Sequence, residues 1–361
     1  MRRRVSAALA GVALIALAAS GLGLRTSGAG EPERADISTT QAEMSALREA
    51  YRRVDEAVYP PENPYSPAKA ALGQHLFFDT LLSGERSMSC ASCHVPTQSW
   101  SDGRPRGIGE TGAAMKVRTP TLLDVAQIPI LGWDGKFRDL ESVAFTPITS
   151  ASAMNLTEAT LLARLRAAPA YVRAFAGAFP ERAAAGAPEE AISRRTVELA
   201  LATFQRSIVS GEAPFDRWVE GDETAIPPAA QRGFALFTGK AGCAACHTGW
   251  NFTDNRFHDL GLPTGDLGRA AFEPDSVLAR HAFKTPGLRN LTYRAPFGHA
   301  GQFADLEAIL AFYETGGLAR PSKSPLMKPL QLAPEERADL IAFLRSLTAE
   351  QTRTALPNLP N

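Results

Sequence analysis

The stretch Cys90-Ala91-Ser92-Cys93-His94 decides the fold of this chain, and Cys243-Ala244-Ala245-Cys246-His247 repeats its pattern. The two copies contain all 4 cysteines of the 361-residue sequence. Cys-x-x-Cys followed directly by His is the attachment signature of a c-type haem, in which both thiols form thioethers with the porphyrin. The adjacent His is placed to ligate the iron, so His94 and His247 are the predicted proximal ligands.

The same four cysteines allow two other interpretations, which are a single zinc site and a pair of disulfides. Either one leaves the trailing histidines of both motifs unexplained. The sequence therefore predicts two covalently bound haem c groups as cofactors. The predicted attachment residues are Cys90 and Cys93 for the first haem, and Cys243 and Cys246 for the second.

The N-terminus has the features of a targeting segment. Met1-Arg2-Arg3-Arg4 leads into an apolar run from Val5 to about Leu24, and small residues follow. A basic start, an apolar middle and a small-residue exit are typical of a secretory signal peptide, which we place at residues 1–29. The run is long for a signal, so an uncleaved membrane anchor is the alternative. Both interpretations predict a periplasmic protein, because c-type haem is attached in that compartment.

Composition excludes two classes of partner. The formal net charge is zero, and loss of residues 1–29 would leave 34 basic against 38 acidic side chains, since four arginines and no acid lie there. A chain without a basic excess is not expected to bind nucleic acid. After the N-terminal run, no apolar stretch is long enough to span a membrane.

Apolar residues at helical spacing predict helices at residues 41–58, 156–179, 191–208 and 334–347. The last of these opens with Pro334-Glu335-Glu336, which is typical of a helix start. Alternating strand patterns are few, and the chain has 29 Gly and 26 Pro. The predicted fold is mostly α, with long irregular loops that enclose the haems.

A short internal repeat precedes the two haem motifs. Gly73-x-x-Leu76-Phe77 lies before the first and Gly233-x-x-Leu236-Phe237 before the second, which indicates a duplicated unit. We therefore expect two tandem cytochrome c-like domains, at residues 30–225 and 226–361, with the boundary near residues 221–228.

Several further segments resemble the bacterial dihaem cytochrome c peroxidase and MauG superfamily, over about residues 68–347. The segments that carry the resemblance are Leu72–Asp79, Leu82-Ser83, Arg118–Leu123, Trp133–Lys136, Arg206–Ile208, Pro214–Arg217, Phe283–Asn290 and Pro296–Gly301. In that family the N-terminal haem is the peroxide site, and the C-terminal haem stores or relays an electron. The sixth ligand of the C-terminal haem varies. Met marks the peroxidase type, and Tyr marks the MauG type, which oxidises Trp residues of a partner protein.

The resemblance implies an oxidoreductase that reduces hydrogen peroxide, with electrons from a small redox protein or from side chains of a partner protein. The alternative is a dihaem electron carrier without enzymatic activity, in which both irons would be six-coordinate and inert to peroxide.

For the first haem, residues 95–153 contain no His, so we expect an open distal side that needs no reductive activation. Met115 could ligate there, although a packed loop Met is the more ordinary reading. Peroxide cleavage needs an acid/base group, and the family has a Glu eight residues after the Trp of its Trp-Asp-Gly motif. That position is Glu141, the predicted catalytic residue. Leu131 stands where the family often has Gln.

For the second haem, the resemblance implies a sixth ligand six residues after the Glu of Leu306-Glu307. That residue is Tyr313, whose alternative role is packing in the core. Met327 is the other nearby candidate. His299 matches the family's Pro-Phe-x-His-x-Gly turn and is expected to support the site, and His75 is expected to be structural.

A calcium site between the haems is a further implication of the resemblance. Its backbone ligands would be the carbonyls of Arg294 and Pro296. The side-chain ligand would be an Asn in the first haem loop, but residues 95–153 contain no Asn, which leaves calcium open. Core packing is the expected role of each tryptophan, although any could relay electrons; they are Trp100, Trp133, Trp218 and Trp250.

Overall fold

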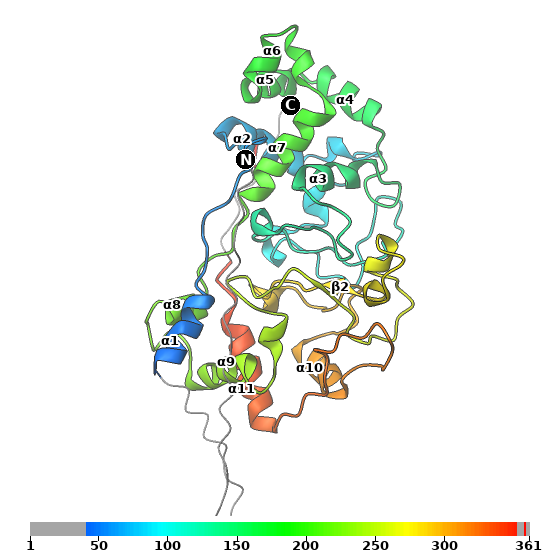
Figure 1. The fold of residues 1–361 in the computed structure, drawn as a ribbon. Helices are drawn as coiled ribbons and strands as arrows, with labels where there is room; N and C mark the ends of the chain where they lie inside the picture. Colours follow the sequence, from blue (N-terminus) through cyan, green and yellow to red (C-terminus); the bar gives the residue numbers. More distant parts are fainter. Residues whose placement is uncertain (1–40, 352–356, 359–361) are drawn as a thin grey trace, which may run out of the picture. The chain divides into compact units, whose positions relative to one another are not determined.

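The computed structural model describes residues 41–351 and 357–358 of the chain (Figure 1). The signal peptide or anchor predicted at residues 1–29 lies outside this range. The described part is mostly helical with one two-stranded antiparallel sheet, which confirms the predicted fold class. None of its helices has the length and apolar character needed to cross a membrane.

The secondary structure consists of α-helices, short 3-10 helices and two short strands. The α-helices are α1 Gln41–Ala50, α2 Pro67–Phe78, α3 Leu140–Thr149, α4 Glu158–Ala167, α5 Pro169–Ala178, α6 Pro180–Ala183, α7 Arg194–Arg206, α8 Pro214–Val219, α9 Pro228–Thr238, α10 Leu306–Thr315 and α11 Pro334–Ser346. The strands are β1 Phe257–His258 and β2 Phe283–Lys284. The 3-10 helices are η1 Thr80–Leu82, η2 Cys90–Ser92, η3 Pro96–Gln98, η4 Val125–Gln127, η5 Pro188–Ala191, η6 Cys243–Ala245, η7 Arg269–Ala271, η8 Val277–Ala279 and η9 Leu291–Tyr293.

Proline explains why one predicted helix is two. The apolar spacing at residues 156–179 continues through α4 and α5, but the chain breaks at Ala168. Pro169 disfavours helical geometry at the residue before it and is itself well suited to the first turn of a new helix. The helix predicted at residues 41–58 is also shorter, because the chain leaves α1 after Ala50 and buries Tyr51 against Phe234.

The first haem motif lies on a core formed where α2 crosses α7. A Cβ atom added at Gly73 would lie 1.9 Å from the Ala200 carbonyl oxygen and 2.9 Å from the Cβ of Phe204. Only glycine permits so close an approach of the two backbones. Cys90 packs against the same core.

The second haem motif lies on a core of the same construction, where α9 crosses α11 (Figure 1). A Cβ atom at Gly233 would lie 2.0 Å from the Asp339 carbonyl oxygen and 2.7 Å from the Cβ of Phe343. The repeated Gly-x-x-Leu-Phe pattern thus marks one helix crossing that occurs twice, as expected for a duplicated unit.

A second internal repeat extends this correspondence. Residues 131–141 (LGWDGKFRDLE) and residues 297–307 (FGHAGQFADLE) align without a gap. Each begins with a hairpin-like bridge, Leu131 to Phe137 and Phe297 to Phe303, and then starts a helix with an Asp cap. By this alignment α3 and α10 are equivalent helices.

The two repeats contact each other reciprocally. The Arg118 backbone N–H donates to the carbonyl of His299, and the Lys284 N–H donates to the carbonyl of Trp133. Arg118 aligns with Lys284, and Trp133 aligns with His299. The contact therefore resembles the isologous interface of a two-fold dimer, although both halves belong to one chain.

Candidate functional site

In the first haem motif, η2 brings Cys90, Cys93 and His94 together in one turn. The His94 N–H donates to the Cys90 carbonyl at 2.9 Å, and the His94 Nδ1 lies 3.0 Å from the carbonyl oxygen of Trp100. Trp100 has a φ of 57°, a left-handed conformation that is uncommon for a large residue. This backbone geometry accompanies a contact that fixes the imidazole ring.

The second motif repeats this geometry. The His247 N–H donates to the Cys243 carbonyl at 2.9 Å, and the His247 Nδ1 lies 2.9 Å from the carbonyl of Phe252. Phe252 also has a left-handed φ, 54°. Tyr51 approaches from α1, with its hydroxyl 3.4 Å from the His247 carbonyl.

This arrangement fits histidines that bind iron. A carbonyl partner fixes the proton on Nδ1 and leaves the Nε2 lone pair free for a metal. Burial lowers the pKa of both His94 and His247 and so favours the neutral, ligating form, against the opposing effect of their carbonyl partners.

The thiols also fit haem attachment better than the alternatives. All four cysteines are free of disulfides, and each pair belongs to a different core, so they cannot share one zinc ion. Burial raises the pKa of Cys90 and of Cys243 to about 12. Zinc can displace thiol protons, so what excludes one shared zinc site is the separation of the two motifs.

Behind each histidine lies a hydrogen bond that the sequence analysis missed. Ser101 Oγ donates to the Thr119 carbonyl at 2.8 Å, and Thr253 Oγ1 donates to the Thr285 carbonyl at 2.7 Å. The sequence does contain a repeat at these positions, a basic residue followed by Thr-Pro, in Arg118-Thr119-Pro120 and Lys284-Thr285-Pro286. The hydrogen bond ties each histidine-bearing loop to the segment that contacts the other repeat.

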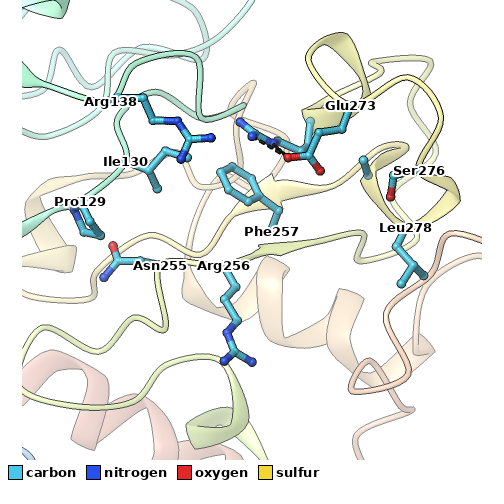
Figure 2. A pocket seen from close by; sticks show the side chains of 11 residues that line it. Pro129, Ile130, Arg138, Asn255, Arg256, Phe257, Glu273, Ser276 and Leu278 are labelled. Atoms are coloured by element: carbon cyan, nitrogen blue, oxygen red, sulfur yellow. Dashed lines mark hydrogen bonds and ion pairs between the residues drawn. The ribbon is translucent and has the colours of Figure 1, made fainter. Parts of the chain in front are cut away.

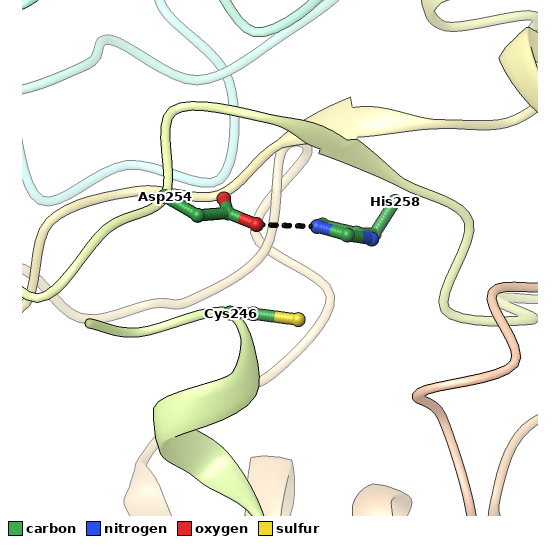
Figure 3. Close-up of side chains that lie close together, drawn as sticks. All are labelled: Cys246, Asp254 and His258. Carbon is green, nitrogen blue, oxygen red and sulfur yellow. Dashed lines mark hydrogen bonds and ion pairs between the residues drawn. The ribbon is translucent and has the colours of Figure 1, made fainter. Parts of the chain in front are cut away.

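A cluster of possible metal ligands lies beside the second haem motif. Figure 3 shows Cys246, Asp254 and His258, whose ligand atoms lie within 4.8 Å of one another. The His258 Nε2 is 2.8 Å from Asp254 Oδ2. Because haem attachment converts the Cys246 thiol to a thioether, we assign this cluster to the surroundings of the haem and not to a separate metal site.

Glu141 lies in the first turn of α3 as half of a buried ion pair. Arg206 on α7 donates to both of its oxygens, at 2.6 and 2.9 Å, and Asn63 Nδ2 donates to Oε1 at 2.9 Å. Burial alone would raise the pKa of Glu141, but the hydrogen bonds from Arg206 and Asn63 outweigh it and hold that pKa below its usual value. Leu131 packs nearby in a small apolar cluster with Leu140.

Tyr313 lies on α10, close to both cysteines of the second haem motif. Burial raises the pKa of its phenol, and the thiols of Cys243 and Cys246 act in the same direction. The ring packs against the core that Cys243 also contacts. Met327 is buried in the following loop.

The alignment of α3 with α10 gives a direct comparison of the two distal helices. Glu141 aligns with Glu307, and Tyr313 aligns with Pro147. Proline has no group that can ligate iron. The two helices therefore present different chemistry at equivalent places, although their Asp caps and first turns match.

The comparisons with known proteins identify the family. The sequence model for di-haem cytochrome c peroxidase matches residues 67–224, and that for cytochrome c matches residues 230–348. The methylamine utilization protein MauG of Methylorubrum extorquens is 49% identical over 328 residues, which cover 90% of this chain and 91% of that protein. The chain belongs to the dihaem cytochrome c peroxidase and MauG family.

Other relatives in this family agree with that assignment. Cytochrome c551 peroxidase of Pseudomonas aeruginosa is 31% identical, over 82% of this chain and 83% of its own length. The crystal structure of a MauG-like protein associated with microbial copper homeostasis superimposes with a TM-score of 0.76 at 32% identity, covering 82% of this chain and 94% of that one. Family membership confirms the predicted tandem cytochrome c-like domains, the two c-type haems and an oxidoreductase that acts on peroxide.

Within this family fold, His299 and His281 have hydrogen-bonding partners in the second repeat. His299 is buried, stacks on Phe283 with ring centroids 3.6 Å apart, and has its Nε2 2.9 Å from Asp266. The His281 Nδ1 lies 2.8 Å from the Asp266 carbonyl oxygen. His75 lies in α2, as predicted.

Met115, the candidate ligand for the first haem, lies in a loop, and a cavity opens elsewhere in the described part of the chain. Met115 lies in a hairpin whose Ile108 carbonyl is 3.9 Å from Cys93 Sγ. A cavity of about 430 Å³ opens between the segments around Pro129 and Phe257, with Arg138 and Arg256 among its lining residues (Figure 2). It contains none of the predicted site residues.

Proposed function

We propose that this protein is a periplasmic MauG-like enzyme, which uses hydrogen peroxide to oxidise side chains of a partner protein. The observation that carries the proposal is the position of Tyr313 on α10, where it packs against the core that Cys243 also contacts, on a helix equivalent to the one that bears Glu141. Two relatives named methylamine utilization protein MauG, at 49% and 43% identity, support the same choice.

The two repeats would differ in whether a side chain from α3 or α10 can act as the sixth ligand of the haem iron. When bound, haem supplies iron that accepts peroxide oxygen and passes oxidising equivalents onward. In the first repeat, Pro147 stands at the position that aligns with Tyr313, and residues 95–153 contain no His that could ligate the iron. In the second repeat, Tyr313 would close it, since a phenol oxygen can serve as an axial ligand.

Glu141 would act as the acid/base. Its ion pair with Arg206 keeps the carboxylate ionised at neutral pH, which is the form that can accept the first proton of peroxide. A carboxyl with a lowered pKa also returns the proton readily, to the oxygen that leaves. Asn63 and Arg206 would position this group and need not touch peroxide.

The proposal is tested by mixing the fully oxidised holoprotein with hydrogen peroxide in the absence of any reductant. A change in the absorbance of both haems within the mixing time is the expected result. If the spectrum stays unchanged until one electron is added, the protein is a reductively activated peroxidase that takes electrons from a small redox protein. That second function is favoured by the cytochrome c551 peroxidase relatives.

A further inference from the structure

Two buried arginines lie where the two repeats meet. Arg118 belongs to the first repeat, and its backbone N–H donates to His299 of the second. Arg294 belongs to the second repeat and follows η9. Their residues are only 5% and 9% exposed, and the Nε atom of each has no hydrogen-bond partner.

Each guanidinium is fixed to a segment that holds a proximal histidine. Arg118 Nη2 donates to Ser101 Oγ at 3.3 Å, and Ser101 directly follows the Trp100 carbonyl that binds His94. Arg294 Nη2 donates to the Gly287 carbonyl at 2.8 Å. Gly287 directly follows Pro286, whose backbone is within hydrogen-bonding reach of the His247 ring.

Among the described residues neither guanidinium forms a direct ion pair, although Asp102 acts on Arg118 and Asp124 acts on Arg294 at longer range. Burial lowers the pKa of Arg294 to about 9, the positive charge of Arg118 acts in the same direction, and only Asp124 opposes them. Asp124 Oδ1 accepts from the Ser210 N–H at 2.8 Å, and its Oδ2 has no hydrogen-bond partner. Asp102, the acid near Arg118, is bonded to the Thr119 hydroxyl at 2.9 Å.

The first of the two positions is cationic in both repeats. Lys284, which aligns with Arg118, is partly buried, and desolvation lowers its pKa to about 8. Arg294 has no such counterpart, because Ile128 stands at the aligned position. The repeats therefore share one haem-proximal cation each, and Arg294 adds a third positive charge between them.

Two buried like charges without a directly paired counter-ion destabilise the protein interior. An arginine fork matches a carboxylate, and each haem c would bring two propionate carboxylates. We propose that Arg118 and Arg294 bind haem propionates between the repeats, and that Arg294 supplies there the positive charge that a metal cation would otherwise supply.

The proposal has two consequences that can be tested without peroxide. The holoprotein needs no calcium, although carbonyls of Arg294 and Pro296 were predicted as calcium ligands. A buried cation beside a propionate also favours the reduced haem, whose net charge is one unit less positive. Replacing Arg294 by a neutral residue should therefore lower a haem reduction potential.

The experiment compares purified holoprotein of the wild type with Arg294→Met, Arg294→Lys and Arg118→Met. Arg345→Met is the matched control, because it removes a positive charge from the same repeat at an exposed position. Potentials are measured by spectroelectrochemical titration, propionate environment by resonance Raman bands, and calcium by elemental analysis before and after EGTA treatment.

We expect less than stoichiometric calcium in the wild type and no spectral change with EGTA. Arg294→Met should reduce the equilibrium constant for haem reduction at least tenfold, equivalent to 59 mV for one electron, and should shift the propionate bands. Arg294→Lys should change both less, and Arg345→Met should change neither.

One equivalent of calcium whose removal alters the haem spectrum would overturn the proposal without any variant. Unchanged potentials and propionate bands in Arg294→Met would overturn it as well. If Arg294→Met does not fold, the wild-type calcium measurement and Arg294→Lys still decide. Neither result depends on whether the MauG-like activity is correct, since all readouts are taken without peroxide.

Discussion

Replacement of Glu141 by Gln separates catalysis from stability at one position. Gln has nearly the same shape, and its Oε1 can still accept from Asn63 and from one Arg206 N–H. Its amide NH2 group faces the other Arg206 donor, and the Arg206 charge is left uncompensated in a site where both side chains are at most 7% exposed. Breaking a buried ion pair in this way costs about 3–5 kcal/mol of unfolding free energy. Loss of a general acid/base lowers the rate of its step by about 10²–10⁴-fold, or roughly 3–5 kcal/mol of activation free energy.

Because the two effects have similar magnitudes, the control must match the stability cost. Asp216 pairs with Arg289 at 2.9 Å in the second repeat, and both side chains are 2% exposed. Asp216→Asn should cost about as much stability as Glu141→Gln by the same reasoning. Glu307→Gln is the second control, since Glu307 aligns with Glu141 but lies 3.6 Å from Arg345 on the surface.

The assay is stopped-flow mixing of oxidised holoprotein with hydrogen peroxide, together with denaturant unfolding of each variant. We expect slow peroxide reaction in Glu141→Gln alone, and lowered stability in both Glu141→Gln and Asp216→Asn. Equal loss of rate in Asp216→Asn would show that the defect comes from instability. A wild-type rate in Glu141→Gln would refute the acid/base role and leave Glu141 as a structural partner of Arg206.

Three further predictions follow from single contacts. Tyr313→Phe removes the proposed phenol ligand, so the second haem should no longer respond to peroxide in the fully oxidised protein, as absorbance at each haem would show; an unchanged response would exclude the ligand. Gly233→Ala places a Cβ atom 2.0 Å from the Asp339 carbonyl and should cost about 1–3 kcal/mol by denaturant unfolding. Its control is Gly177→Ala, where nothing lies within 4 Å of the added atom and a helical Ala should add roughly 0.5–1 kcal/mol. Folding lowers the pKa of Glu141, so the ionised Glu141 stabilises the fold fully above about pH 4.3, the pKa of Glu in the unfolded chain. This stabilisation is lost as pH falls through the lower pKa of the folded protein. The drop in melting temperature at acid pH should therefore be smaller in Glu141→Gln than in the wild type.

Local chemistry explains what the sequence could predict. Haem attachment requires particular residues at fixed spacing, so both motifs were visible without a structure. Helices α7 and α11 carry continuous apolar spacing and lie close to the predicted residues 191–208 and 334–347. Pro169 could have predicted the break between α4 and α5 at Ala168. The apolar spacing continues across the break, so it predicted one helix in place of two.

Long-range relations were harder to predict. The correspondence of residues 131–141 with residues 297–307 was not predicted, although the two stretches share Gly, Phe, Asp, Leu and Glu at the same spacing. The Arg118 and Arg294 approach could not have been predicted by any local pattern. It depends on how the two repeats meet, which follows from backbone contacts made by residues more than 100 positions apart.

The duplicated unit gives a physical reason why one chain can hold two haems with different tasks. The helix crossings at Gly73 and Gly233, the carbonyl partners of His94 and His247, and the Asp caps of α3 and α10 are the same in both repeats. The helix crossings and the carbonyl partners fix the position of each haem motif and its histidine, so changing them would disturb the site of cofactor attachment.

The distal helices are not under that constraint, and there the repeats differ. Helix α3 carries Pro147 and the buried Glu141–Arg206 pair. At the equivalent positions, α10 carries Tyr313 and the exposed Glu307–Arg345 pair. A Pro147→Tyr variant would place a phenol at the position in the first repeat that aligns with Tyr313. If distal residues alone set the division of labour, that variant should keep both haems and lose its reaction with peroxide. Retained reactivity would mean that the iron of the first haem is kept open by the loop at residues 95–153 and not by the identity of residue 147.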